Sequence, residues 1–220
     1  MTIESVNFDA LSATSVTHDP FPWLIVPGFV RDEAIAAIEE DYPVVDMPGS
    51  LPLPTLKYGK AFDRFMQDIQ SPRMTAIIAE KFGIDLTDRP TTVTVRGQCR
   101  ASDGKIHADS KTKLVTVLIY MNGNWEAPGG RLRLLRSPDN LNDVVAEVPP
   151  ERGTMLAFLN QPNAWHGHKS FEGARRAIQL NWVTDHGAVK REILRHRISA
   201  FFKKIRGLSR TEKNDQNRHL

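Results

Sequence analysis

The chain has 220 residues, of which 40% are hydrophobic and 25% charged, a size and composition typical of one globular domain with its own core. Its single cysteine, Cys99, excludes an internal disulfide, and the first residues do not combine a basic segment with an apolar run, so a cytoplasmic protein is expected. The longest apolar run, residues 114–121, suits a strand and is too short for a membrane span, so none is predicted.

The net charge of +3 is unevenly distributed along the chain. Residues 186–220 hold ten Lys and Arg against three acidic residues, a net charge of +7 that leaves −4 for residues 1–185. A basic segment of this kind can bind nucleic acid or anionic lipid. Because residues 1–185 are acidic overall and lack a basic groove with interleaved aromatic residues, nucleic acid is not expected as a partner.

The first part of the chain favours a short strand followed by helices. Residues 21–30 predict a buried strand interrupted by Pro27 and Gly28. Residues 31–41 predict a helix, because they are good helix formers with acids in the first turn. The Pro- and Gly-rich residues 42–55 then predict a loop, whose length is typical of functional or mobile segments.

A second helix is predicted at residues 72–82, with Ser71 as its N-cap and Gly83 as its terminator. From residue 90 onward the hydrophobic period changes to that of strands, which are predicted at residues 91–99, 113–122, 129–136, 153–160 and 175–185. Successive short strands without helices between them indicate an antiparallel sandwich or barrel. We therefore expect one mainly β domain over residues 1–185, with flanking support helices at 30–83 and a β core at 90–185.

The basic residues 186–220 are expected to form an amphipathic C-terminal helix and tail. Leu194, Ile198, Phe201 and Ile205 make an apolar stripe at helical spacing. Docking of this stripe on the domain and pairing with a second copy of the chain, as a homodimer, both explain it.

Two metal-capable side chains, His107 and Asp109, precede the most apolar predicted strand. Residues two apart on an extended segment point the same way, a geometry suited to chelation, although Asp109 alone could merely orient His107 or cap a turn. His166 and His168 follow another apolar strand, and a barrel brings the ends of distant strands together. Two histidines and one carboxylate on one face of a metal are typical of non-haem Fe(II) oxygenases; a zinc hydrolase, with similar ligands, is the alternative.

Two arginines, Arg175 and Arg176, follow these histidines on a predicted strand. An Fe(II) centre that activates O₂ needs electrons from a co-substrate, and 2-oxoglutarate chelates the metal while its distal carboxylate requires a cation such as a guanidinium. Arg176 shares a strand face with Ile178, Leu180 and Trp182, and this apolar face is expected to point inward. Arg176 is therefore the favoured anchor and Arg175 the alternative.

The ordered set of motifs over residues 90–185 resembles the prolyl 4-hydroxylase-like branch of the 2-oxoglutarate and Fe(II)-dependent dioxygenases. The set comprises His107-Ala-Asp109, the apolar strand after it, Gly129-Gly130 with the strand that follows, Pro150 and Gly153, His166, and an arginine followed by Trp182. The resemblance implies a double-stranded β-helix, which is a jelly-roll or cupin-like barrel, with N-terminal support helices. It makes His107, Asp109 and His166 the metal ligands and Arg176 the anchor for the 5-carboxylate of 2-oxoglutarate.

In this resemblance His166 is preferred to His168 as a ligand because its spacing to Arg176 and Trp182 fits the family. His168 is then expected near the metal ligands, facing the substrate, or in a solvated loop. Many relatives carry a tyrosine on the strand before the first histidine, where this sequence has Arg96, Gln98 and Arg100, so co-substrate contacts on that side stay open.

The activity implied is hydroxylation of an unactivated C–H bond in a peptidyl, amino-acid-like or other small-molecule substrate, with release of succinate and CO₂. Fe(II), 2-oxoglutarate and O₂ are the implied cofactors, with ascorbate in a supporting role. The alternative is a non-catalytic or isomerase-type cupin-like barrel that binds a small ligand. Such a barrel does not require the metal triad and an inward arginine together.

Overall fold

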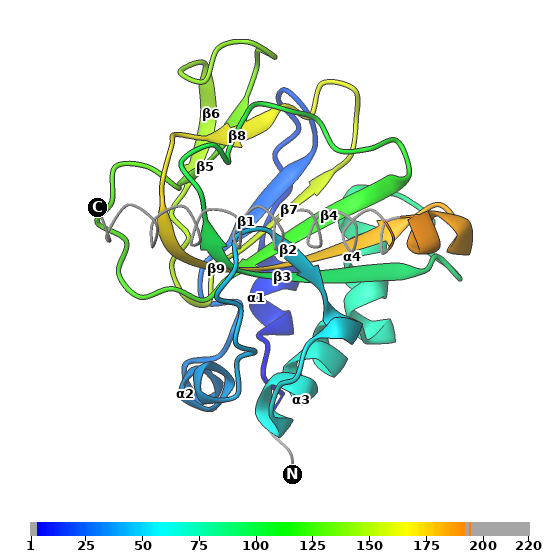
Figure 1. Ribbon diagram of the computed structural model, residues 1–220. Helices are drawn as coiled ribbons and strands as arrows, with labels where there is room; N and C mark the ends of the chain where they lie inside the picture. The colour runs from blue at the N-terminus through cyan, green and yellow to red at the C-terminus, as the bar shows by residue number, and fades with distance from the viewer. Residues whose placement is uncertain (1–3, 192–193, 195–220) are drawn as a thin grey trace, which may run out of the picture.

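The fold consists of two antiparallel sheets with helices packed on one side of the larger sheet (Figure 1). The computed structural model describes residues 4–191 and 194. The helices are α1 (Phe8–Ala13), α2 (Asp32–Glu40), α3 (Lys60–Ile69) and α4 (Pro72–Phe82), with a 3₁₀ turn, η1 (Leu53–Thr55). The strands are β1 (Trp23–Val26), β2 (Ser50–Pro52), β3 (Thr91–Cys99), β4 (Lys113–Tyr120), β5 (Leu132–Leu135), β6 (Val144–Val148), β7 (Met155–Leu159), β8 (His166–His168) and β9 (Gly173–Val183).

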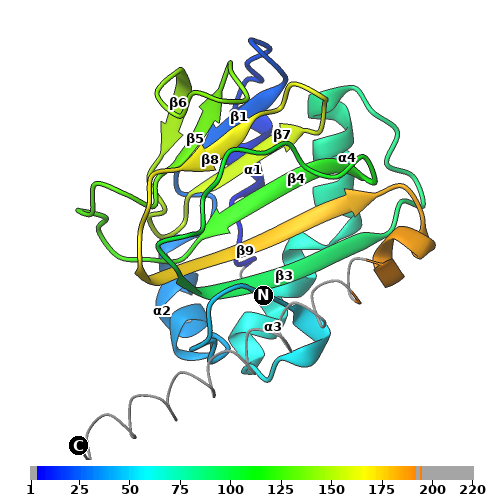
Figure 2. The same cartoon turned by 45° about the horizontal axis from the view of Figure 1, so that its top comes forward.

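The large sheet has the strand order β1-β7-β4-β9-β3-β2, and the small sheet has the order β6-β5-β8. Figure 2 shows β3, β9, β4 and β7 side by side, with β5, β6 and β8 across from them. The sheets are antiparallel and do not close into a barrel, and the arrangement matches a double-stranded β-helix. The predicted fold class, mainly β with flanking helices, is therefore confirmed.

Local sequence explains the best-defined helix, α4. Ser71 Oγ accepts a hydrogen bond from the Met74 amide at 3.2 Å, which satisfies one of the unpaired N–H groups of the first turn. Pro72 occupies the first helical position, and Gly83 ends the helix in the left-handed region at φ 61°. Both ends of α4 therefore lie where the sequence predicts them.

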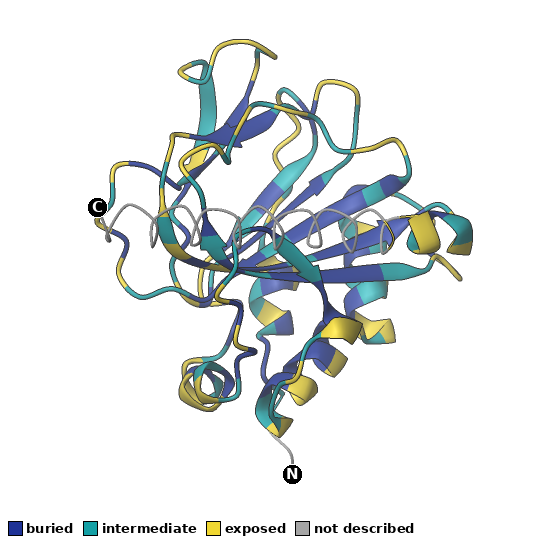
Figure 3. Cartoon of the chain, in the orientation of Figure 1, coloured by how far each residue is buried: buried dark blue, intermediate teal, exposed yellow. Residues whose placement is uncertain are grey.

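The core has two layers, one on each face of the large sheet. Between the sheet and the helices lie the larger aliphatic and aromatic side chains, including Ile178, Leu180 and Trp182 of β9. Between the two sheets lies a smaller cluster that includes Tyr120, Phe158 and Ala177. Figure 3 shows that the large sheet is buried along most of its length. A strand of this sheet is therefore covered on both faces, and its more apolar face packs against the helices.

Several elements escape the sequence analysis. The predicted loop at residues 42–55 contains β2 and η1, because Ser50–Pro52 pairs with the distant strand β3. The sequence patterns also do not predict α1, α3 or the short strands β6 and β8. Short strands owe their existence to partners far away in the sequence, which a local pattern does not reveal.

Residues 186–191 continue as a helix after β9. Most of the predicted C-terminal helix lies outside the described residues, and so does its apolar stripe apart from Leu194, which is exposed. Within residues 4–191 and 194, none of the helices has the length and apolarity that a membrane crossing requires.

Candidate metal centre

Three predicted ligands, His107, Asp109 and His166, come together at one end of the space between the sheets. One ligand atom of each lies within 4.8 Å of the others, and the two imidazole centroids are 4.3 Å apart. The backbones of His107 and His166 pair directly, because each amide donates to the other residue's carbonyl at 3.0 Å. Main-chain hydrogen bonds therefore hold the two imidazoles next to each other.

The tautomer of each imidazole follows from its backbone contact. Nδ1 of His107 lies 2.9 Å from the Lys105 carbonyl, and Nδ1 of His166 lies 3.0 Å from the Ala164 carbonyl. Because a carbonyl only accepts, both Nδ1 atoms carry the hydrogen and both Nε2 atoms keep a free lone pair. Such contacts are the ones that orient metal-binding histidines.

The Asp109 carboxylate is held on both oxygens. Lys113 Nζ lies 2.9 Å from Oδ1, and the Thr116 hydroxyl donates to Oδ2 at 2.6 Å. Burial raises the pKa of Asp109, but Lys113, His166 and Thr116 outweigh this effect and bring the pKa to about 2. Asp109 is therefore an anion at any physiological pH.

Burial also keeps the nearby histidines neutral. It lowers the pKa of His166 to about 4, against the opposing attraction of Asp109. Burial lowers the pKa of His168 to about 4 as well, with a further contribution from Arg175. Two imidazoles and one carboxylate, from His107, His166 and Asp109, form a donor set that fits Fe(II) and leaves one face of the metal open.

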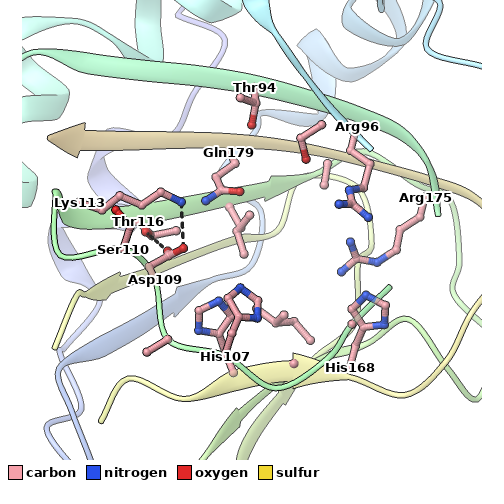
Figure 4. A pocket seen from close by; sticks show the side chains of 18 residues that line it. Thr94, Arg96, His107, Asp109, Ser110, Lys113, Thr116, His168, Arg175 and Gln179 are labelled. Carbon is pink, nitrogen blue, oxygen red and sulfur yellow. Dashed lines mark hydrogen bonds and ion pairs between the residues drawn. The ribbon is translucent and has the colours of Figure 1, made fainter. Parts of the chain in front are cut away.

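These groups line a cavity of about 280 Å³ between the two sheets. Figure 4 shows Lys113 and Asp109 at one end of this cavity and Arg96, Arg175 and His168 at the other. His168 lies two residues along β8 from His166 and faces the arginines, with its Nε2 3.9 Å from Cys99 Sγ. His168 is buried and therefore does not lie in a solvated loop, and its role toward the metal or the substrate stays a prediction.

The expected orientation of the two arginines was wrong. Arg175 is 5% exposed and lines the cavity, and its Nε donates to the Gly130 carbonyl at 2.8 Å. Arg176 is exposed on the other face, where its guanidinium lies 5.3 Å from the Tyr42 ring centroid. The alternation of side chains along β9 does place the two arginines on opposite faces, as predicted. The apolar face, however, was expected to point into the cavity. That face packs against the helices instead.

Sequence reasoning also missed Tyr120. Its side chain is fully buried, and the Arg175 guanidinium lies 5.3 Å from its ring centroid. Among the described residues, its hydroxyl has no hydrogen-bond partner. The spacing along β4 could have revealed it. Thr116, Leu118 and Tyr120 are two residues apart and therefore share a strand face, and Thr116 and Leu118 line the cavity.

Comparisons with known proteins agree with this geometry. The model of the 2OG-Fe(II) oxygenase superfamily matches residues 97–184, which include all three predicted metal ligands. No curated protein matches the sequence.

Two solved structures share the fold at low sequence identity. A prolyl-4-hydroxylase from Pseudomonas putida is 16% identical with a TM-score of 0.51, and the match covers 80% of this chain and 88% of that one. A prolyl 4-hydroxylase from Phytophthora capsici is 15% identical with a TM-score of 0.51, and the match covers 81% of this chain and 63% of that one. Residues 97–184 therefore resemble the 2OG-Fe(II) oxygenase superfamily, and the fold of the chain is like that of the prolyl 4-hydroxylases.

Proposed function

We propose that this protein is an Fe(II)- and 2-oxoglutarate-dependent dioxygenase that hydroxylates an unactivated C–H bond. The substrate, a small molecule, an amino-acid-like compound or a peptide, gains one oxygen atom of O₂, and 2-oxoglutarate takes the other and leaves as succinate and CO₂. One observation carries the proposal: the His107, Asp109 and His166 group and the buried Arg175 line the same cavity.

In this proposal His107, Asp109 and His166 hold the iron on one face. When bound, Fe(II) with 2-oxoglutarate and O₂ supplies an oxidant strong enough for unactivated C–H bonds, which protein side chains alone cannot attack. Backbone carbonyls orient both imidazoles, burial keeps that of His166 neutral by lowering its pKa to about 4, and Thr116 and Lys113 hold the Asp109 carboxylate.

Arg175 is the proposed anchor for the distal carboxylate of 2-oxoglutarate, in place of Arg176. A guanidinium remains charged at all working pH values and pairs with carboxylates in a bidentate geometry. The unpartnered hydroxyl of Tyr120, next to Arg175, is a second donor for the same carboxylate. A buried hydroxyl without a partner is costly, so an acceptor that arrives there is favoured.

The activity is tested with purified protein, Fe(II), 2-oxoglutarate and ascorbate, which keeps the iron reduced. Slow release of succinate without any added substrate is expected, together with 2-oxoglutarate binding in calorimetry under anaerobic conditions. Asp109→Ala is expected to abolish metal binding while the circular dichroism spectrum is retained. A folded protein that neither binds 2-oxoglutarate nor forms succinate contradicts the proposal.

Two adjacent arginines provide a matched pair of variants for the anchor. Arg175→Gln is expected to weaken 2-oxoglutarate binding by at least about tenfold, the effect of one lost charge-assisted contact. Arg176→Gln removes the same charge one residue away, on the exposed side, and is expected to leave the affinity unchanged. Equal effects of the two substitutions, or a larger effect at Arg176, contradict the assignment of Arg175.

A further inference from the structure

We propose that the substrate is a small acid and that Arg96, at the rim of the cavity, binds its anionic group, a carboxylate or a phosphate. This inference rests on the proposed function, because it concerns the same cavity. It assigns a role to Arg96, the second arginine of the cavity, whereas the proposed function assigns one only to Arg175.

The two arginines of the cavity occupy different depths. Arg175 comes from the central strand β9 and is almost fully buried. Arg96 comes from β3, directly opposite Ser50 on the edge strand β2, and 23% of its side chain is exposed. Of the two arginines, Arg96 is therefore the more accessible to a molecule that enters the cavity after 2-oxoglutarate.

Arg96 is oriented by one of its two terminal nitrogens. Nη1 donates to Asp103 Oδ2 at 2.9 Å and lies 3.5 Å from Cys99 Sγ. The Asp103 carboxylate also accepts from the Arg100 amide, which fixes its position. No hydrogen bond of the described residues uses Nη2 or Nε of Arg96, so this edge of the guanidinium is available to an anion. An arginine held in this way loses little side-chain entropy when it binds one.

The charges around the cavity favour a negatively charged substrate. The lining includes the cations Arg96, Lys113 and Arg175 and the anion Asp109, and Asp103 pairs with Arg96 from behind. The lining itself therefore carries three cations and one anion, and Fe(II) and 2-oxoglutarate add equal and opposite charges. This cationic lining attracts a negatively charged substrate more than a neutral one.

The size and polarity of the cavity favour a small hydrophilic molecule. Its volume of about 280 Å³ is below the range of about 300–1,000 Å³ that is usual for small-molecule pockets, and 2-oxoglutarate must share it. The cavity is also lined by Ser50, which lies opposite Arg96 in the sheet, and by the polar side chains of Thr94 and Gln179, which are labelled in Figure 4. A neutral, apolar group such as a proline ring inside a peptide cannot form hydrogen bonds with these polar side chains.

The test uses calorimetry on full-length protein loaded with Zn(II) and 2-oxoglutarate, so that binding is measured without turnover. The probes are two acids with neutral counterparts: N-acetyl-L-proline with N-acetyl-L-prolinamide, and glycerol 3-phosphate with glycerol. At least one acid is expected to bind about tenfold or more tightly than its counterpart, the effect of one charge-assisted contact. The pair that shows the preference distinguishes a carboxylate from a phosphate.

Two variants assign the preference to a residue. Arg96→Gln is expected to lose the preference for the acid and to retain 2-oxoglutarate binding. Arg136→Gln, which removes an arginine paired with Asp19 on the surface, is the matched control and is expected to keep the preference. Retention of the preference in Arg96→Gln overturns the inference, and so does a loss of 2-oxoglutarate affinity equal to that in Arg175→Gln.

The outcomes separate this inference from the proposed function. Binding of 2-oxoglutarate is measured first on the same sample, and its absence contradicts the proposed function itself. Normal binding of 2-oxoglutarate with no preference for either acid overturns the substrate inference alone. A tighter affinity for the neutral prolyl compound than for its acid also overturns it and favours a peptide substrate.

Discussion

The two faces of the large sheet differ in composition and in task. The face toward the helices carries Trp182, Leu180 and Ile178 of β9, which are fully buried in the larger core cluster. The face toward the small sheet carries Arg175 and Gln179 of the same strand, which line the cavity. One strand therefore supplies the core with its even-numbered residues and the candidate site with its odd-numbered residues.

This difference shows why apolar character alone does not identify the face of a strand that looks into an active site. When helices cover one face and a polar cavity lies on the other, the apolar residues point away from the chemistry. Substitutions on the helix face should then change stability without changing ligand binding, and substitutions on the cavity face should do the reverse. Substitutions at Trp182, Thr116 and Ser71 test this separation.

The largest effect is expected on the helix face, at Trp182. Its side chain is fully buried, and its Nε1 donates to Thr75 of α4 at 3.3 Å. Trp182→Ala is expected to lower the free energy of unfolding by about 3–5 kcal/mol, as is usual for large-to-small core substitutions, measured by urea denaturation. Gln179→Ala, on the cavity face of the same strand, is the control and is expected to cost much less. Similar losses in the two variants contradict the separation.

The next largest effect concerns acid stability and His168, which lies on β8 of the small sheet and lines the cavity from the opposite side. The pKa of His168 is lowered from 6.5 to about 4 in the folded protein. Between these pH values His168 is therefore protonated in the unfolded chain and neutral in the folded protein. The free energy of unfolding is therefore expected to fall as the pH decreases from 6.5 to 4, by up to about 3 kcal/mol for this group. Chemical denaturation of metal-free protein across this range measures the decrease.

The matched variant for this prediction is His168→Gln. It removes the titrating group, so the decrease in unfolding free energy between pH 6.5 and 4 should become smaller. The share that comes from His166, whose pKa is lowered in the same direction, should remain. An unchanged pH dependence in His168→Gln shows that His168 does not contribute.

A smaller effect is expected at Thr116, on the cavity face of β4. Its hydroxyl donates to Asp109 Oδ2 at 2.6 Å. Thr116→Val keeps the shape but removes this donor, and is expected to weaken Zn(II) or Fe(II) binding by about 10- to 100-fold, the usual effect of losing a hydrogen bond to a metal ligand. Calorimetry under anaerobic conditions measures the affinity. Thr116→Ser retains the hydroxyl and should bind metal as the wild type does.

The smallest effect is expected at Ser71, the N-cap of α4, which is one of the helices that cover the helix face of the sheet. Ser71→Ala removes the N-cap of α4 and is expected to cost about 1 kcal/mol in unfolding free energy. Metal and 2-oxoglutarate affinities are expected to stay unchanged, because α4 touches only the helix face of the sheet. A change in either affinity shows that the two faces are coupled more strongly than the packing indicates.

Much of the fold is predictable from local sequence. α4 has its cap, its proline and its terminating glycine, and the long strands β3, β4 and β9 have strong periodic patterns. α3 could also have been predicted, because its buried residues Phe62, Phe65, Met66 and Ile69 follow helical spacing. β2 and β8 were not, because each has three residues and is defined by partners more than thirty positions away.

The candidate site was predictable in part. The sequence predicted the convergence of His107, Asp109 and His166, and the structure brings these three together. Their role as iron ligands remains a proposal. The positions of Arg175 and Tyr120 depend on which face of each strand the helices cover, and this is a property of tertiary packing. The rim position of Arg96 depends on β2, which the sequence analysis placed in a loop.

The backbone pairing of His107 with His166 has a consequence for the choice of metal in the cell. Because main-chain hydrogen bonds hold both imidazoles in place, the site is complete before any ion arrives and requires no folding step to select one. A rigid site with two histidines and a carboxylate binds divalent ions in the general order of affinity, in which Zn(II) and Cu(II) precede Fe(II). Under the proposed function, loading with iron therefore depends on the supply of iron, and an excess of zinc is expected to inhibit the protein without unfolding it.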